Sequence, residues 1–165
     1  MSLLRRLRDH PYILEAAYRF TMAVVRRLDP FMKRIGYDRS NVAFRIPERL
    51  VKQAVFDCKM CGQCALHFTG MTCPMGCPKN LRNGPCGGVR ADMTCEVDPG
   101  MKCVWIEAYE RSRKMKFYSN DIFEIRPPLN HRLAGSSAFI NILSLQGDDM
   151  PAAWQTQTGL THDDE

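Results

Sequence analysis

The sequence predicts a mostly α-helical protein that contains one irregular, cysteine-rich segment. Apolar residues recur at helical spacing in the first 50 residues and again after Cys103. Between residues 57 and 103 this periodicity is lost, glycine and proline are dense, and all eight cysteines occur. Loops with so few apolar residues bury too little surface to fold alone, so we expect a bound metal to staple them.

Composition and charge divide the 165 residues into three regions. Residues 1–50 form a helical extension of net charge +6, residues 51–118 form the eight-cysteine metal domain of net charge +4, and residues 119–165 form an extended tail of net charge −5. A chain of this length has no room for a large second catalytic domain.

The first 50 residues and those just after them should form three helices. The first runs over residues 11–28 and opens on Pro11, a residue favoured at the first helical position. The second spans 29–36 and the third 46–56, each opening near a proline. The first helix carries more apolar residues than a surface stripe needs, so we expect part of that face to cover the cysteine segment, a partner protein or a membrane surface.

The pattern weakens toward the C-terminus. Residues 103–115 again have helical spacing, residues 121–126 favour a brief strand or extended segment, and residues 138–145 are a short apolar run of either type. Residues 146–165 are polar and acidic, and we expect them to order only on a partner.

The N-terminus and the charge pattern restrict location and partners. No apolar signal core or membrane-spanning run is present, because Arg5, Arg6 and Arg8 lead into an amphipathic stretch. We therefore expect a cytoplasmic protein, in which eight cysteines indicate metal ligation rather than disulfides. No dense Lys/Arg run alternates with aromatic residues, so nucleic-acid binding is not expected.

The cysteine spacing favours two iron–sulfur clusters. The array opens with C-x2-C-x2-C, which resembles the run that wraps a cubane cluster in bacterial ferredoxins, and eight thiolates make two sets of four. Two structural zinc sites would also use eight cysteines, although zinc modules usually present separated C-x2-C pairs. The spacing is thus compatible with iron–sulfur clusters and with zinc. The eight candidate ligands are Cys58, Cys61, Cys64, Cys73, Cys77, Cys86, Cys95 and Cys103.

The first three cysteines should share one site. We expect its fourth ligand to be Cys77 or Cys103, with the remaining four cysteines forming the second site. His67 follows closely and could replace a thiolate, but with eight cysteines available a packed or partly exposed histidine is the better expectation.

Four motifs carry a family resemblance: C-x2-C-G-Q-C at 58–64, C-P-x2-C-P-K at 73–79, R-N-G-P-C-G-G at 82–88 and C-E-V at 95–97. The segment from Phe56 to about Arg111 resembles the methylenetetrahydrofolate reductase C-terminal-like family. In that family the module is fused to a flavin-dependent reductase barrel or made as a small subunit beside it. It is regarded as the cluster-bearing component that admits electrons.

The resemblance implies a stand-alone accessory subunit with no catalytic site of its own. It implies two 4Fe-4S clusters, with zinc as the alternative, and a flavin-dependent methylenetetrahydrofolate reductase as the partner in one-carbon metabolism. A ferredoxin or an NADH-oxidising subunit would be the electron donor. If the metal is zinc, the implied role is structural, as an assembly subunit of the same complex.

Overall fold

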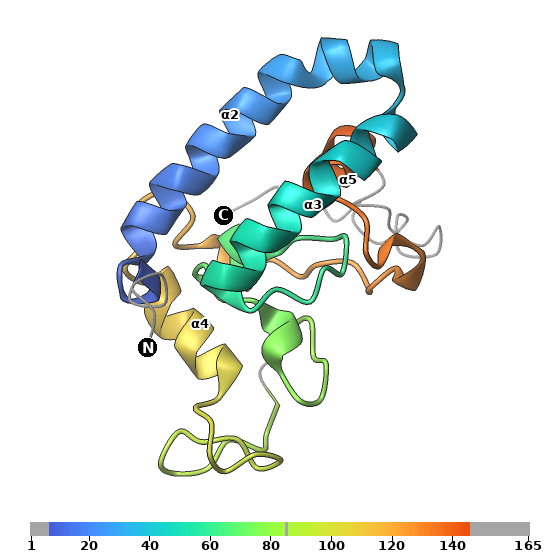
Figure 1. Ribbon diagram of the computed structural model, residues 1–165. Helices are drawn as coiled ribbons and strands as arrows, with labels where there is room; N and C mark the ends of the chain where they lie inside the picture. Colours follow the sequence, from blue (N-terminus) through green and yellow to red (C-terminus); the bar gives the residue numbers. More distant parts are fainter. Residues whose placement is uncertain (1–6, 85, 146–165) are drawn as a thin grey trace, which may run out of the picture.

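The computed structural model describes residues 7–84 and 86–145 (Figure 1). This part of the chain is mostly helical and contains no β-strand, only the isolated bridges Val89–Cys95 and Thr94–Lys102. The predicted helical class is therefore confirmed. The α-helices are α2 (Pro11–Ile35), α3 (Tyr37–Phe56), α4 (Val104–Ser112) and α5 (Ala138–Leu143). Short 3-10 turns lie between them: η1 (Leu7–Asp9), η2 (Leu66–Thr69), η3 (Pro74–Gly76), η4 (Asp121–Phe123) and η5 (His131–Leu133).

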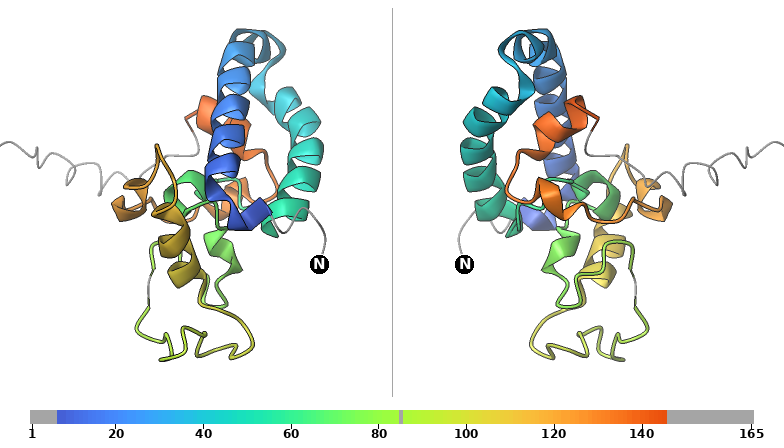
Figure 2. Two further views of the ribbon diagram at one scale, coloured as in Figure 1. Left: turned by 90° about the vertical axis from the view of Figure 1, so that its left-hand side faces the viewer. Right: turned by 90° about the vertical axis from the view of Figure 1, so that its right-hand side faces the viewer.

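Helices α2 and α3 form a hairpin, and the cysteine loops follow its open end (Figures 1 and 2). The hairpin turns at Gly36, whose φ of 94° suits glycine and whose N–H donates to the carbonyl of Met32 at 2.9 Å. Short helix α5 contacts both arms of the hairpin, and α4 packs on η2 and η3. Chain segments far apart in sequence therefore meet around residues 57–76.

Two predicted helix breaks are absent. Helix α2 runs through Pro30 as one element, and α3 begins at Tyr37, well before the expected start, and contains Pro47. Tertiary contacts explain both. Around Pro30, Asp29 pairs with Lys33 at 2.6 Å and accepts a hydrogen bond from Tyr37 at 2.7 Å, and these contacts stabilise the helix on both sides of the proline. Next to Pro47, buried contacts to α5 hold the helix.

The predicted positions of the other helical segments agree better with the structure. Helix α3 ends at Phe56 as predicted, and α4 confirms a helix after Cys103. The apolar run from residue 138 is helical, as α5. The brief strand or extended segment expected at 121–126 is wrong for Asp121–Phe123, a 3-10 turn that contacts η2, whereas Glu124 is extended. The predicted tail at 146–165 lies outside the described residues.

The apolar core joins the N-terminal helices to the cysteine region. Its buried members come from α2, α3, η2 and the segments beside η2 and α4, and they are Leu14, Val55, Leu66, Met71 and Met115. Beside Leu14, the buried carboxylate of Glu15 accepts hydrogen bonds from three consecutive backbone N–H groups, those of Lys116, Phe117 and Tyr118, at 2.7–2.9 Å. The hairpin is thus anchored to the segment after α4.

The outward faces of the hairpin keep many large apolar side chains exposed. On α2 these include Phe20 and Phe31, exposed by 72% and 62%, and on α3 they include Ile46 and Leu50. The first helix does carry more apolar surface than its own packing buries, as the sequence predicted. None of the helices in the described ranges is long and apolar enough to cross a bilayer.

Candidate metal centre

The first cysteine loop turns sharply after α3. Asp57 ends the helix in a left-handed conformation with φ 51°, and Met60 has φ 49°. That conformation directs the Met60 N–H toward the Cys58 sulfur, with the nitrogen 3.3 Å from Sγ. Backbone N–H groups that face cysteine sulfur are a common way to stabilise thiolate ligands. The loop is therefore shaped to present sulfur together with donors.

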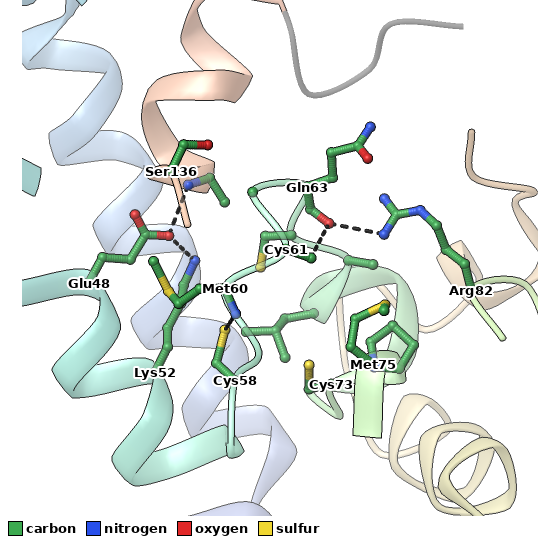
Figure 3. Close-up of a pocket in the computed structure, with 16 residues that line it drawn as sticks. Glu48, Lys52, Cys58, Met60, Cys61, Gln63, Cys73, Met75, Arg82 and Ser136 are labelled. Carbon is green, nitrogen blue, oxygen red and sulfur yellow. Dashed lines mark hydrogen bonds and ion pairs between the residues drawn. The ribbon is translucent and has the colours of Figure 1, made fainter. Parts of the chain in front are cut away.

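Four cysteines from this region line one pocket (Figure 3). They are Cys58, Cys61, Cys64 and Cys73, each partly buried and none in a disulfide. From the sequence we expected Cys77 or Cys103 to be the fourth ligand of the first site. In the structure the fourth cysteine that lines the pocket is Cys73. The reason is the reversal after Cys64: η2 and the left-handed Gly70, with φ 59°, return the chain toward the first loop. No single motif in the sequence shows that return.

The four thiols influence one another. Cys58 and Cys73 are hydrogen-bonded, which raises the pKa of the Cys58 thiol and lowers that of Cys73. Burial raises the pKa of the Cys61 thiol, opposed by its contact with the Gln63 backbone. Apolar side chains complete much of the wall, among them Met60, Ala65, Leu66, Pro74 and Met75. The pocket thus gathers soft sulfur ligands in largely dry surroundings.

Two buried cations also line this pocket, one on each side in Figure 3. Lys52 from α3 is 5% exposed, and Arg82 from the loop after Cys77 is 8% exposed. Burial alone would lower the pKa of Lys52, but the neighbouring Cys64 and Glu48 outweigh it and the net shift is upward. Burial lowers the pKa of Arg82, with Cys61 opposing it. Both side chains remain charged at neutral pH.

The Arg82 guanidinium is held by backbone carbonyls. Its Nε donates to the Pro127 carbonyl at 2.8 Å and its Nη1 to the Gln63 carbonyl at 3.1 Å. Its Nη2 is buried and makes no hydrogen bond with any described residue. A buried donor without a partner is costly, so this atom fits an acceptor or an anion inside the pocket.

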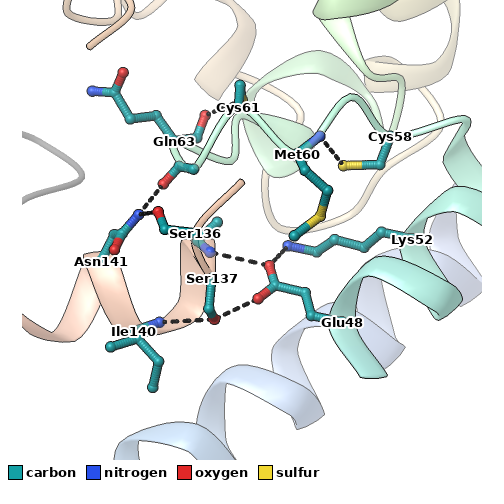
Figure 4. A network of polar contacts seen from close by, with 12 residues as sticks. Glu48, Lys52, Cys58, Met60, Cys61, Gln63, Ser136, Ser137, Ile140 and Asn141 are labelled. Atoms are coloured by element: carbon teal, nitrogen blue, oxygen red, sulfur yellow. Dashed lines mark hydrogen bonds and ion pairs between the residues drawn. The ribbon is translucent and has the colours of Figure 1, made fainter. Parts of the chain in front are cut away.

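Hydrogen bonds connect helix α5 and its N-cap to α3 and to the cysteine loop beside the pocket (Figure 4). Glu48 bonds Lys52 at 2.5 Å and accepts hydrogen bonds from the Ser137 hydroxyl at 2.5 Å and the Ala138 N–H at 3.2 Å. The Asn141 amide donates to the Gly62 carbonyl at 2.7 Å. This network of hydrogen bonds was not predicted from the sequence. Its only signal was the i,i+4 spacing of Glu48 and Lys52, which usually marks a solvent-exposed pair.

The other four cysteines lie in or beside the loop that follows. Cys77, Cys95 and Cys103 are buried and Cys86 is partly buried. Backbone bonds from Cys95 to Met101 at 3.1 Å and from Cys103 to Met93 at 2.9 Å tie the loop together. Cys86 and Cys95 both act on the charge of Lys79, so these two approach the same lysine.

The described residues hold no group of three or more Cys, His, Asp or Glu side chains arranged around a single metal ion. The donor set itself fits a thiolate-bound metal group: four cysteines, one N–H aimed at sulfur, an orphaned guanidinium donor and two buried cations.

His67 is a packed histidine. Its Nδ1 lies 3.0 Å from the Asp121 carboxylate, and its ring contacts Tyr18, Phe68 and Tyr118. Burial lowers the pKa of His67, while Asp121 opposes that shift. These partners agree with the expectation of a packed ring rather than a substitute ligand.

The comparisons with known proteins give a family and no closer relative. No curated protein matches the chain, and no solved structure matches it. Residues 37–132, more than half of the chain, match the family described as "Methylene-tetrahydrofolate reductase C terminal". The matched region includes α3 with Lys52, all eight cysteines and Arg82. The chain therefore belongs to the methylene-tetrahydrofolate reductase C-terminal family.

Proposed function

We propose that this chain is a non-catalytic iron–sulfur subunit that carries electrons to the flavin of a separate methylenetetrahydrofolate reductase. The observation that carries the proposal is the pocket where Cys58, Cys61, Cys64 and Cys73 meet two buried cations. Family membership supports the choice of a reductase as the partner. The proposed electron donor is a ferredoxin or an NADH-oxidising subunit.

The C-x2-C-x2-C run of the first pocket supports a cluster over a single zinc ion. Zinc needs all four ligands within about 2.3 Å of one point. In a cubane cluster each cysteine binds a different corner iron, so the sulfurs stay apart. Three cysteines spaced three residues apart can each reach a different iron, whereas zinc modules usually present two separated C-x2-C pairs. We propose Cys77, Cys86, Cys95 and Cys103 as the ligands of a second cluster.

The residues of the first pocket have separable tasks. Its four cysteines would hold the cluster, which when bound supplies one-electron storage. The Met60 N–H would remain a donor to the Cys58 sulfur, and Ala65 and Leu66 would limit water. Donors to the sulfurs and a dry wall are the protein's main means of setting a cluster potential.

Metal analysis of anaerobically purified protein tests the proposal. We expect about eight iron and eight sulfide ions per chain, with brown colour that dithionite bleaches. Replacing Cys73 by Ser should lower iron to about four per chain, whereas Met75→Leu on the same pocket wall should leave it unchanged. Two zinc ions without sulfide would contradict electron transfer and support a structural subunit instead.

The exposed apolar face of α2 supports contact with the reductase. Phe20 and Phe31 expose large rings on one helix, and unpartnered apolar patches commonly mark protein interfaces. We expect Phe20→Gln with Phe31→Gln to weaken co-purification with the reductase while iron content stays the same. Phe123→Gln, on the 73% exposed ring of η4, is the control. Unchanged binding by the double variant would place the contact elsewhere.

A further inference from the structure

Metal binding in the first pocket would concentrate negative charge that the cysteines themselves do not offset. Four thiolates bring four negative charges into a site that is lined largely by apolar groups. A cluster held by four thiolates keeps a net negative charge, and each added electron increases it. Burying an uncompensated charge is costly, so compensating charge is expected nearby.

Lys52 is held in a position to supply that charge. Its ammonium group pairs with Glu48 at 2.5 Å and lies 4.1 Å from the centre of the Phe139 ring. Glu48 fixes the position of this ammonium group, and the same carboxylate is itself held by hydrogen bonds from Ser137 and Ala138. Cys64 and Cys58 both stabilise the charged form of Lys52. The lysine is therefore fixed and electrostatically coupled to the cysteines.

Arg82 supplies a second charge by a different route. Two of its nitrogens are occupied by the carbonyls of Pro127 and Gln63, which fix the plane of the guanidinium. The remaining Nη2 is buried without a hydrogen bond among the described residues. An arginine beside Cys61 in a pocket of four cysteines, with both donors of Nη2 left over, is suited to hydrogen-bond a sulfur of the bound group.

We propose that Lys52 and Arg82 are positioning residues that together offset the charge of the metal group in the first pocket and raise its reduction potential. This inference rests on the proposed electron-transfer function. Neither residue is a metal ligand. Their effect comes from fixed positive charge, which favours the state that holds one more electron.

The test is a dithionite titration of the anaerobic full-length protein, followed by electron paramagnetic resonance, with iron determined in parallel. Lys52→Met and Arg82→Met should each shift one of the two midpoint potentials to a lower value, and the other midpoint serves as an internal reference. Arg82→Lys keeps the charge and should shift the potential less. Lys33→Met removes the same charge from an exposed lysine of α2 that pairs with Asp29, and should shift neither.

Glu48→Gln keeps the test valid if the methionine variants fail to fold. This variant removes a negative charge next to Lys52, so the same midpoint should rise rather than fall. A purely structural role for these residues would not reverse the direction of the shift. Unchanged potentials in iron-loaded variants would overturn the inference and leave the proposed function intact. If the protein without any substitution binds no iron, both this inference and the proposed function are overturned.

Discussion

Buried charged side chains join distant parts of this chain. Glu15 binds the backbone after α4, Glu48 joins α3 to α5, and Arg82 ties the cysteine loop to Pro127. Each makes at least one hydrogen bond that crosses 45 or more positions in the sequence. Such residues resemble ordinary surface charges in a sequence, because their partners are not adjacent. Their burial is decided by the tertiary fold, so sequence periodicity could not reveal them.

Replacing Glu15 should destabilise the protein strongly. Glu15→Ala leaves three backbone N–H groups without their acceptor, and each unsatisfied buried donor costs about 1–3 kcal/mol. We expect the free energy of unfolding to fall by about 3 kcal/mol or more, measured by denaturant or thermal unfolding of the metal-loaded protein. Glu110→Ala, at an exposed ion pair, should change it by less than about 1 kcal/mol. Equal effects would show that the Glu15 bonds are dispensable.

The environment of His67 should make stability depend on pH. Its pKa is lowered from the ordinary value of 6.5, mainly by burial, so the folded protein prefers the neutral ring. As the pH falls below about 6.5 the unfolded chain binds a proton first, and the free energy of unfolding decreases. The decrease levels off below the lowered pKa of the folded state. Stability from this group is therefore complete above pH 6.5 and lost on acidification.

Thermal unfolding between pH 8 and pH 5 tests the His67 effect, with pH steps of about half a unit. His67→Gln should remove part of the slope, while His131→Gln, at an exposed histidine, should keep all of it. Acid release of metal would affect all three proteins alike. If the slope is the same in His67→Gln and the unchanged protein, another group is responsible.

At the scale of elements, the sequence predicted identities better than boundaries. The helical region before the cysteines, the end of α3 at Phe56 and the helix after Cys103 were all readable from periodicity. The helix starts predicted at Pro30 and Pro47 are wrong, because both prolines lie inside continuous helices. Contacts remote in sequence, such as those from Glu48 to α5, outweighed the local preference. The position of Cys73 in the first pocket could not be predicted for the same reason, because it depends on the chain reversal through η2.

Two glycines, each directly after a cysteine, provide a matched test of the loop geometry. A Cβ at Gly62 would lie 2.1 Å from the Leu133 carbonyl oxygen, and Gly62 has a φ of +77°. A Cβ at Gly87 would meet nothing within 4 Å. Gly62→Ala should therefore force the segment at Leu133 away and cost at least about 1–3 kcal/mol in backbone strain. We expect low soluble yield and reduced iron, whereas Gly87→Ala should behave normally. Full iron loading of Gly62→Ala would contradict this packing.

At the scale of the whole molecule, two regions differ in how they are held together. The α2–α3 hairpin, α5 and η2 share an apolar core and the Glu15 and Glu48 networks. Among the described residues of 77–103, the loop has isolated β-bridges, a few backbone bonds and a small interior formed by its cysteines, Arg82 and Val89. If the cysteines bind metal, the loop depends on that metal far more than the hairpin does.

Metal removal should therefore open the molecule unevenly. We expect limited proteolysis of chelator-treated protein to cut first within residues 77–103, while a fragment containing α2 and α3 survives longer. The physical reason is that the loop loses its internal cross-links, whereas the hairpin keeps buried apolar contacts such as Leu14 with Val55 and Leu66. Mass spectrometry of the fragments locates the cuts, and metal-loaded protein digested in parallel is the control. Cys86→Ser should reproduce the loop cuts without chelator, and Ser144→Ala, a polar change at the end of α5, should not. Simultaneous loss of hairpin and loop would mean that the metal holds the whole fold together, and unchanged protection of the loop would mean that its own contacts suffice.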